Sequence, residues 1–435
     1  MKKIIFDLRP QGQEGGDFYI LLSIISFFLL INFAYFSLNL MSSSNVEIYA
    51  FNELFVNYQA GFIRRGLLGE IAWQFYHQFS VNPETFFSII FFTIYLAQVF
   101  LFFYIFKKYI ISKFIFILIV FSPSLLLFHI YNPDLYFLKD SLIKFALLLH
   151  AFIFYKFSYL KKDNKKYFKF LNFLIVPLLF LLILIHEYQV FSLSLHFLIS
   201  LGTTKSKNEI KRLILFYIPL IFPIILISIF FGDQDQFNVL SEILSKFEIQ
   251  LNPYLGGGLY HYIGGFYKWH FFYFTYRDFV NLFFSVILSV IIFYILFSYL
   301  IKNKILSFHS KYQKEYLKYF IPVLIPFFLA TDHGRNLSFV SFYLISFYLI
   351  LKLNTSLLIK KTKIIYENTI NKYFIISFLF FYVFMWKLNQ VAGFGLRGIP
   401  NDIFQSSLFA EFVKFIKFLY IFIDVNIFDL PEIKL

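Results

Sequence analysis

Residues 174–188 read LIVPLLFLLILIHEY, an unbroken apolar run that ends abruptly in His186, Glu187 and a tyrosine. An apolar helix of about 20 residues crosses the hydrocarbon core of a bilayer, because each residue adds about 1.5 Å. The surrounding stretch, 168–201, is too long for one crossing and carries its polar residues near the middle. We therefore expect a hairpin of two short membrane helices, with His186 and Glu187 at the turn.

The rest of the 435-residue chain has the same apolar character. Hydrophobic residues make up 59% of it and charged residues only 15%, with a mean hydropathy of +0.71. A soluble domain has about 25% charged residues. The composition predicts an all-α polytopic membrane protein, a single membrane domain over 1–435. The net charge of +14 does not indicate nucleic-acid binding, because lysines gather in cytoplasmic loops beside anionic headgroups. The absence of cysteine excludes disulfides and thiolate sites.

The distribution of basic residues predicts the topology. A second hairpin is expected at 318–352, around the sequence TDHGRN, and single spans at 18–40, 86–106, 113–130, 141–157, 213–231, 280–301 and 372–388. With the N-terminus in the cytoplasm, 26 Lys and Arg residues fall in cytoplasmic loops and eight outside, as the positive-inside rule requires. This gives eleven membrane segments. The segment 389–435 is either a twelfth span or an interfacial helix, and the main outside loops are 41–85 and 232–279.

Ionisable residues gather at the outer ends of these spans. They are Arg64, Arg65, Asp134, Lys139, Asp140, His186, Glu187, Asp332, His333 and Arg335. Guanidinium groups bind phosphate oxygens bidentately. Glu187 follows an apolar run, so desolvation is expected to raise its pKa and suit it to general-base catalysis. A transporter is expected to hold its charges near mid-bilayer, so charges at the outer ends favour an enzyme acting on a lipid-linked substrate.

Structural interpretations of the same residues stay open. Arg64 and Arg65 can anchor an interfacial helix by extending their charges toward water. Lys139 and Asp140 can form a local ion pair, and His186 with Glu187 can tie the two halves of the hairpin. No tight ligand spacing supports a metal site, so neither a metal nor a cofactor is expected.

Four short motifs together suggest a family. They are AGFIRRGLLGE at 60–70, KDSL at 139–142, HE at 186–187 and DHGRN at 332–336. In these motifs the chain resembles O-antigen and exopolysaccharide polymerases of the Wzy/EpsG-like kind, which belong broadly with the GT-C membrane glycosyltransferases. The resemblance implies a GT-C-like fold in the bacterial inner membrane with a periplasmic active site. It also implies transfer of a growing glycan from undecaprenyl diphosphate to another lipid-linked repeat unit, without metal, beside chain-length regulator and flippase proteins.

The resemblance also implies roles for the candidate residues. Arg64, Arg65 and Arg335, with His333, would bind the donor diphosphate. Glu187, assisted by His186, would be the general base, with Asp332 as its rival. Asp134, Lys139 and Asp140 would position sugars, and the aromatic loop around Tyr260 and Trp269 would stack on sugar faces.

Four alternatives stay open. One is a GT-C enzyme that takes a single sugar from a polyprenyl phosphate, and the second is a glycan ligase. The third is a flippase or transporter of lipid-linked glycan, and the fourth is a structural subunit of a polysaccharide export complex. The first outside loop carries only Glu47 and Glu53 before its arginines, which favours a diphosphate donor over a monophosphate.

Overall fold

The computed structural model is mostly helical in the part of the chain that it describes. That part comprises 53–109, 137–160, 163–204, 207–230, 232–247, 283–291, 321–326, 335–345, 386–389, 393–396 and isolated residues between them. Four helices here are long and apolar enough to cross a membrane, namely Pro83–Phe102, Asp140–Ser158, Asn164–Ile185 and Lys207–Ile229. The expectation of a helical membrane protein is confirmed to this extent. The expected span at 18–40 and most of that at 113–130 lie outside the described residues.

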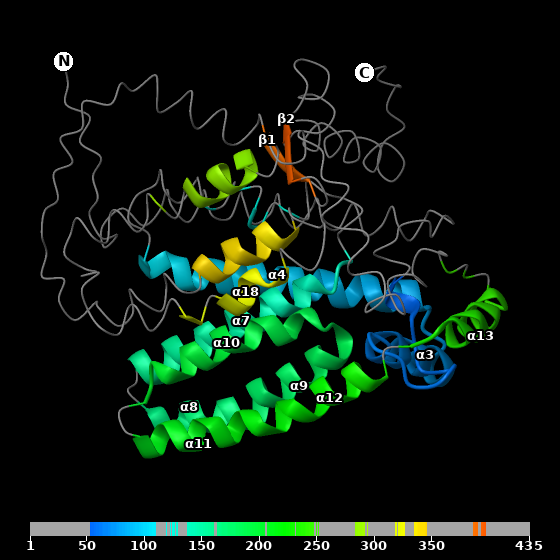
Figure 1. Ribbon diagram of the computed structural model, residues 1–435, viewed down its shortest axis with the longest axis horizontal. Coiled ribbons are helices and arrows are strands. Elements are labelled where there is room, and N and C mark those ends of the chain that lie inside the picture. Colours follow the sequence, from blue (N-terminus) through cyan, green and yellow to red (C-terminus); the bar gives the residue numbers. More distant parts are fainter. Residues whose placement is uncertain are drawn as a thin grey trace, which may run out of the picture.

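The long helices form a stack of near-parallel rods (Figure 1). Its members are α4 (Pro83–Tyr109), α7 (Asp140–Ile153), α10 (Tyr188–Leu201), α9 (Val176–Ile185) and α12 (Ile221–Ile229). In this stack α7 packs on both α4 and α10, and α9 packs on both α10 and α12. Two further helices, α3 (Leu67–Phe79) and α13 (Gln234–Ser245), lie at one end of the stack.

Two prolines shape the long helices. Pro177 cannot donate to the carbonyl four residues earlier, and the π-helical turn η4 (Leu171–Ile175) joins α8 (Asn164–Phe170) to α9 immediately before it. Pro219 lies in η5 (Ile218–Leu220), a 3-10 turn between α11 (Lys207–Tyr217) and α12. A second π-helical segment, η3 (Phe154–Leu160), extends α7. Local tightening or widening of the helix thus keeps each rod continuous through a membrane-length segment.

The hairpin at 168–201 is confirmed, with one correction. His186 has extended backbone angles and ends α9, and α10 begins two residues later at Tyr188. The arms are unequal rather than both short. The first runs over 22 residues, Asn164–Ile185, because the Asp163 side chain caps the polar start of α8 by accepting from Lys166 N. The second has 14 residues.

The second hairpin is only partly within the described residues. Helix α18 (Ile321–Leu324) packs on α10, and a further helix covers 335–345. The turn expected between them lies outside the described residues.

The described residues fit the all-α expectation apart from one short pair of strands at 386–389 and 393–396. Strands β1 (Trp386–Asn389) and β2 (Gly393–Leu396) pair antiparallel, with Trp386 opposite Leu396. The expected span 372–388 therefore ends in a strand. Two of the four residues of β2, Gly393 and Gly395, are glycines, and each disfavours a helix by about 1 kcal/mol relative to alanine.

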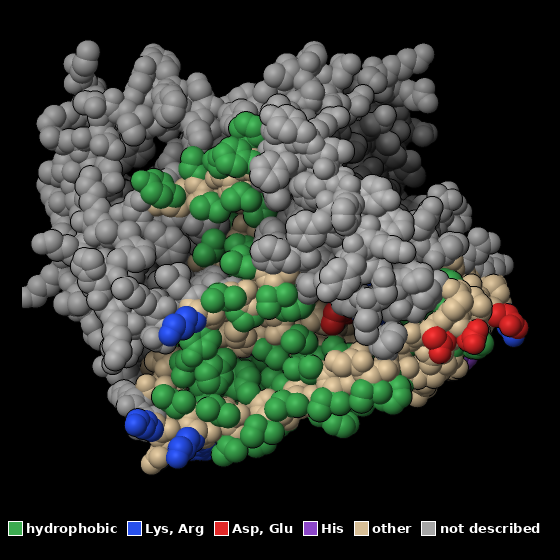
Figure 2. Space-filling model, in the orientation of Figure 1, with side chains coloured by type: hydrophobic (Ala, Val, Ile, Leu, Met, Phe, Trp, Pro, Cys, Tyr) green, Lys and Arg blue, Asp and Glu red, His purple; other side chains and the backbone are tan. Residues whose placement is uncertain are grey.

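The outer face of α11 and α12 carries large exposed apolar side chains, as a lipid-facing surface requires. They include Ile214, Leu215, Ile218, Ile221, Phe222, Ile225 and Ile229. Figure 2 shows this apolar surface between Lys and Arg at one end of the molecule and Asp and Glu at the other. The basic end holds the starts of α8 and α11, and the acidic end holds α13.

Gly69 allows α3 to lie directly on the loop after η1 (Glu53–Phe55). A Cβ atom at Gly69 would lie 2.1 Å from the carbonyl oxygen of Val56 and 2.7 Å from that of Leu54. Both obstacles are backbone atoms, so a side chain there would push α3 away from this loop. The contact matters because the same loop places Glu53 in the charged cluster described below.

We predict that Gly69→Ala destabilises the protein by at least about 1–3 kcal/mol, the usual effect of overpacking. The measurement is thermal unfolding of the purified chain in detergent. Gly202→Ala is the matched control, since its Cβ would lie 3.2 Å from Ile199 O and from the Phe154 ring, which can shift slightly. Equal effects of the two substitutions would contradict this account of Gly69.

Candidate functional site

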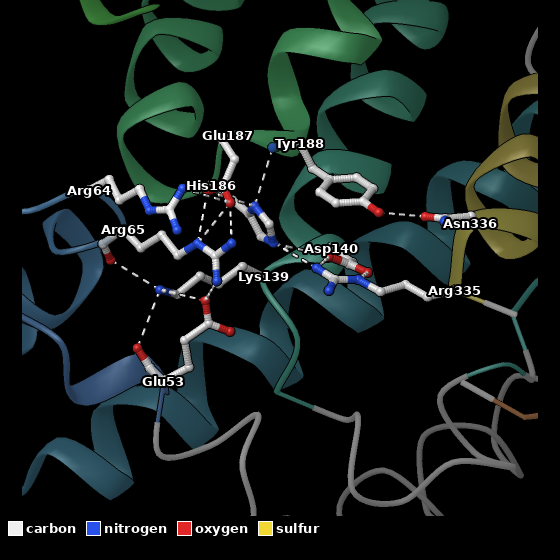
Figure 3. A network of polar contacts seen from close by, with 10 residues as sticks. All are labelled: Glu53, Arg64, Arg65, Lys139, Asp140, His186, Glu187, Tyr188, Arg335 and Asn336. Atoms are coloured by element: carbon white, nitrogen blue, oxygen red, sulfur yellow. Dashed lines mark hydrogen bonds and ion pairs between the residues drawn. The ribbon is translucent and has the colours of Figure 1, made fainter. Parts of the chain in front are cut away.

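Five segments that are distant in the sequence bring charged side chains into one cluster (Figure 3). The segments are η1, the loop before α3, the start of α7, the turn between α9 and α10, and the start of the helix 335–345. Seven residues predicted from the sequence meet there: Arg64, Arg65, Lys139, Asp140, His186, Glu187 and Arg335. The other five predicted residues, Asp134, Tyr260, Trp269, Asp332 and His333, lie outside the described residues.

Arg65 lies at the centre of one half of the cluster. Its Nε donates to both carboxylate oxygens of Glu187, at 3.0 and 2.8 Å, and its Nη2 also contacts Glu187 Oε1. Its Nη1 donates to Glu53 Oε1 at 2.9 Å. Arg64 Nη1 lies 4.0 Å from the same Glu187 oxygen. The two arginines therefore point inward to carboxylates and do not extend toward an interface.

Lys139 fixes the backbone that carries Arg65. Its ammonium donates to the carbonyl oxygen of Arg65 at 3.0 Å and to that of Glu53 at 3.3 Å, and it lies 3.8 Å from Glu53 Oε1. Arg65 has a φ of 67°, a left-handed conformation that is unfavourable for a residue with a side chain. The lysine and the two carboxylates hold Arg65 in this conformation from outside its own loop.

Asp140 and Arg335 form the other half of the cluster. Arg335 binds Asp140 bidentately: its Nε donates to Oδ2 and its Nη2 donates to Oδ1, both at 2.5 Å. Its Nη2 also lies 2.6 Å from His186 Nε2. A guanidinium only donates, and the backbone N–H of Tyr188 donates to Nδ1 at 3.2 Å, so both nitrogens of the His186 ring face N–H donors. Nδ1 also lies 3.5 Å from Glu187 Oε2. His186 thus connects the two halves.

Lys139 and Asp140 do not form the local pair that their adjacency suggested, because they bind Glu53 and Arg335 respectively. Glu187 likewise ties the hairpin turn to Arg65 in another segment.

The surroundings of Glu187 contradict the expectation of a raised pKa. Burial by itself would raise the pKa of Glu187, but Arg65 and His186 lower it well below its ordinary value. Glu53 follows the same pattern: burial is outweighed by Lys139 and Arg65, and its pKa falls to about 2. Both carboxylates are therefore ionised at neutral pH. In this state Glu187 is a partner of Arg65 and a poor base.

Burial is the largest influence on the pKa values of the basic groups in the cluster. Burial lowers the pKa of Lys139 to about 8 even though Glu53 opposes this, so the ammonium stays charged at neutral pH. Burial also lowers the pKa of His186, which is neutral.

The described cluster has a net charge of +1. Its cations are Arg64, Arg65, Lys139 and Arg335, and its carboxylates are Glu53, Asp140 and Glu187. The side chains of Arg65 and Glu187 are each 12% exposed and that of Arg335 is 11% exposed, whereas Lys139 and Asp140 are almost completely enclosed. An anion from solution would therefore meet Arg65 and Arg335 first.

Sequence reasoning missed three members of the site. Glu53 is one of the two acids noted in the first outside loop, but nothing in its neighbours marks it as the partner of Arg65 and Lys139. Tyr188 lies under the Arg335 guanidinium, 4.8 Å from it, and its hydroxyl donates to Asn336 Oδ1 at 2.5 Å. Tyr188 and Asn336 each adjoin a predicted motif residue. That adjacency was the only signal available for them.

Comparisons with family models, with curated proteins and with solved structures find no match to this chain.

We predict that Asp140→Asn destabilises the protein by about 3–5 kcal/mol, because it leaves the Arg335 guanidinium without its buried counter-charge. Thermal unfolding in detergent measures the change. Asp163→Asn is the matched control: it removes an exposed pair with Lys166 at 3.9 Å but keeps a good helix cap, so its effect should be below about 1 kcal/mol. A loss for Asp140→Asn no larger than for this control would show that the buried pair does not hold the segments together.

Proposed function

We propose that this chain is a membrane glycosyltransferase of GT-C-like architecture that polymerises glycan repeat units carried on undecaprenyl diphosphate. The observation that carries the proposal is the meeting of Arg64, Arg65, Lys139 and Arg335 at one end of the helix stack. Guanidinium forks bind phosphate oxygens bidentately, and positive charge stabilises a diphosphate as it leaves.

The position of the cluster fits a substrate whose head lies at a membrane surface. Helix α10 runs from the His186–Glu187 turn at one end of the stack to Leu201 at the other, where the lysine-rich starts of α8 and α11 lie. On the positive-inside rule the basic end faces the cytoplasm. The cluster then faces the periplasm of the bacterial inner membrane, where lipid-linked repeat units await polymerisation.

The reaction assigns complementary roles to the cluster. The acceptor hydroxyl oxygen forms a bond to the anomeric carbon of the donor, and the bond from that carbon to the diphosphate oxygen breaks. The diphosphate leaves with the electron pair, held by Arg64, Arg65 and Arg335. Glu187 takes the hydroxyl proton once Arg65 has turned to the diphosphate, with Asp332 as the rival base. Asp140 and Glu53 act as positioning residues, because they hold Arg335 and Arg65 in place.

We predict that cells carrying Arg65→Ala or Glu187→Gln retain single repeat units on the lipid carrier and lose long glycan chains. The first substitution removes a diphosphate ligand and the second removes the base. Gel electrophoresis separates the surface glycan by chain length into a ladder of bands. The amount of protein in the same membranes is determined in parallel.

The exposed pair of Glu242 and Lys246 on α13 supplies the control for this experiment, and Glu242→Gln should leave the ladder unchanged. A normal ladder in the Arg65 and Glu187 variants, at normal protein levels, would reject the polymerase.

A second candidate, a transporter of lipid-linked glycan, is favoured by one observation. The interior face of α10 carries polar side chains, one at almost every turn. They are Gln189, Ser192, His196 and Ser200, all fully buried. His196 Nδ1 lies 2.9 Å from His150 Nδ1 on α7, and His150 Nε2 lies 2.9 Å from the Tyr167 hydroxyl. Ionisable groups at such depth often mark a pathway, although hydrogen bonds between membrane helices also use them.

Reconstitution into liposomes distinguishes the two candidates. We predict that lipid-linked repeat units supplied on the face of the charged cluster grow longer and stay on that face, because the polymerase acts where its substrate binds. Chain length is measured by gel electrophoresis and sidedness by a membrane-impermeant sugar oxidant. Units that cross the bilayer without growing would favour the transporter.

A further inference from the structure

The Arg65–Glu187 pair occupies the place where a donor phosphate would bind. Glu187 presents two oxygens to the Nε edge of Arg65, the same planar, two-oxygen geometry that a phosphate offers to a guanidinium. Together with Arg335, these two side chains are the part of the cluster that is open to solution. An incoming diphosphate must therefore compete with Glu187 for Arg65.

We propose that Glu187 is a latch that keeps the site inactive until a diphosphate displaces it from Arg65, and that this displacement creates the catalytic base. The inference rests on the proposed function and deepens it, because it makes donor binding and base activation one event. The ligand class is a polyprenyl diphosphate diester.

The neighbours of Glu187 explain why its release changes its chemistry. In the latched state Arg65 keeps the carboxylate ionised against the effect of burial. After release, the charged and titratable groups still facing it are His186, with Nδ1 at 3.5 Å, Arg64, with Nη1 at 4.0 Å, and Lys139, whose charge also interacts with Glu187. Arg64 would itself turn to the diphosphate. The effect of burial, which raises the pKa of Glu187, is then opposed by fewer positive charges. A carboxylate with a higher pKa accepts a proton more readily.

Glu53 makes the exchange possible without loss of the site. It binds Nη1 of Arg65, an edge that Glu187 does not use, and is itself held near Lys139. Lys139 in turn holds the Arg65 carbonyl. The guanidinium therefore stays in position while one of its two carboxylate partners is replaced by the substrate.

Binding of a diphosphate diester by the purified full-length chain tests the latch. The probe is farnesyl-diphosphoryl-glucose, a diester whose own oxygens do not titrate near neutral pH. Glu187→Gln removes the competing charge while keeping the shape of the side chain. We expect it to bind the probe about tenfold more tightly than the wild type while supporting no polymerisation. Glu242→Gln, which removes an exposed acid from α13, should bind within about twofold of the wild type.

A second measurement needs no variant. Calorimetric titration of the wild type in buffers of different ionisation enthalpy should show proton uptake when the probe binds near pH 7, because the released Glu187 gains affinity for a proton. If the wild type binds the probe with no proton uptake, or if Glu187→Gln binds no more tightly, the latch is wrong and the proposed function stands. If the wild type binds no probe and the Arg65→Ala ladder is normal, the proposed function fails and the latch fails with it.

Discussion

The ion pair between Arg65 and Glu187 joins two segments that are 122 positions apart in the sequence, the first outside loop and the turn of the membrane hairpin. Each residue would be costly to bury alone, because an unpaired charge in a low-dielectric interior is strongly unfavourable. Together, and with Glu53 and Lys139, they can be enclosed. The segment that carries Glu53, the loop that carries Arg65 and the hairpin turn that carries Glu187 meet at this group of mutually neutralising charges.

The apolar helices and the charged cluster place opposite demands on the chain. Continuous helices satisfy their own backbone groups within lipid, and the π-helical turn before Pro177 and the 3-10 turn at Pro219 preserve that continuity. The cluster instead needs irregular backbone, such as the left-handed conformation of Arg65 and the extended His186. Placing the irregular segments at the ends of the rods lets side chains from five segments converge without breaking a membrane-length helix.

The hydropathy of the sequence was enough to predict the membrane-length helices and the break after Ile185, because apolar length and polar interruption are local properties. Charge at the segment ends was enough to nominate the seven residues that meet. What could not be read from the sequence is how they pair. Glu53 carries no local signal, and the pKa of Glu187 was expected to rise because its nearest neighbours in sequence are apolar. The decisive neighbour, Arg65, is supplied only by the fold. The polar face of α10 is inconspicuous in the sequence, because serine, glutamine and histidine spaced three or four residues apart barely lower the mean hydropathy of a helix.

The mixture of carboxylates and cations distinguishes this cluster from a simple anion trap. Four uncompensated cations would repel one another and would hold a diphosphate too strongly to release it. With three carboxylates interspersed, the net charge is +1, and the contacts within the cluster already fix the direction of its cations. Such preorganisation is what electrostatic catalysis requires, because dipoles and charges that need not reorient stabilise charge as it develops. The asymmetry between the halves follows the same logic. The Asp140–Arg335 pair has its carboxylate fully enclosed, whereas the Arg65–Glu187 pair is partly open on both partners, so under the proposed function the second is the pair that a substrate would exchange.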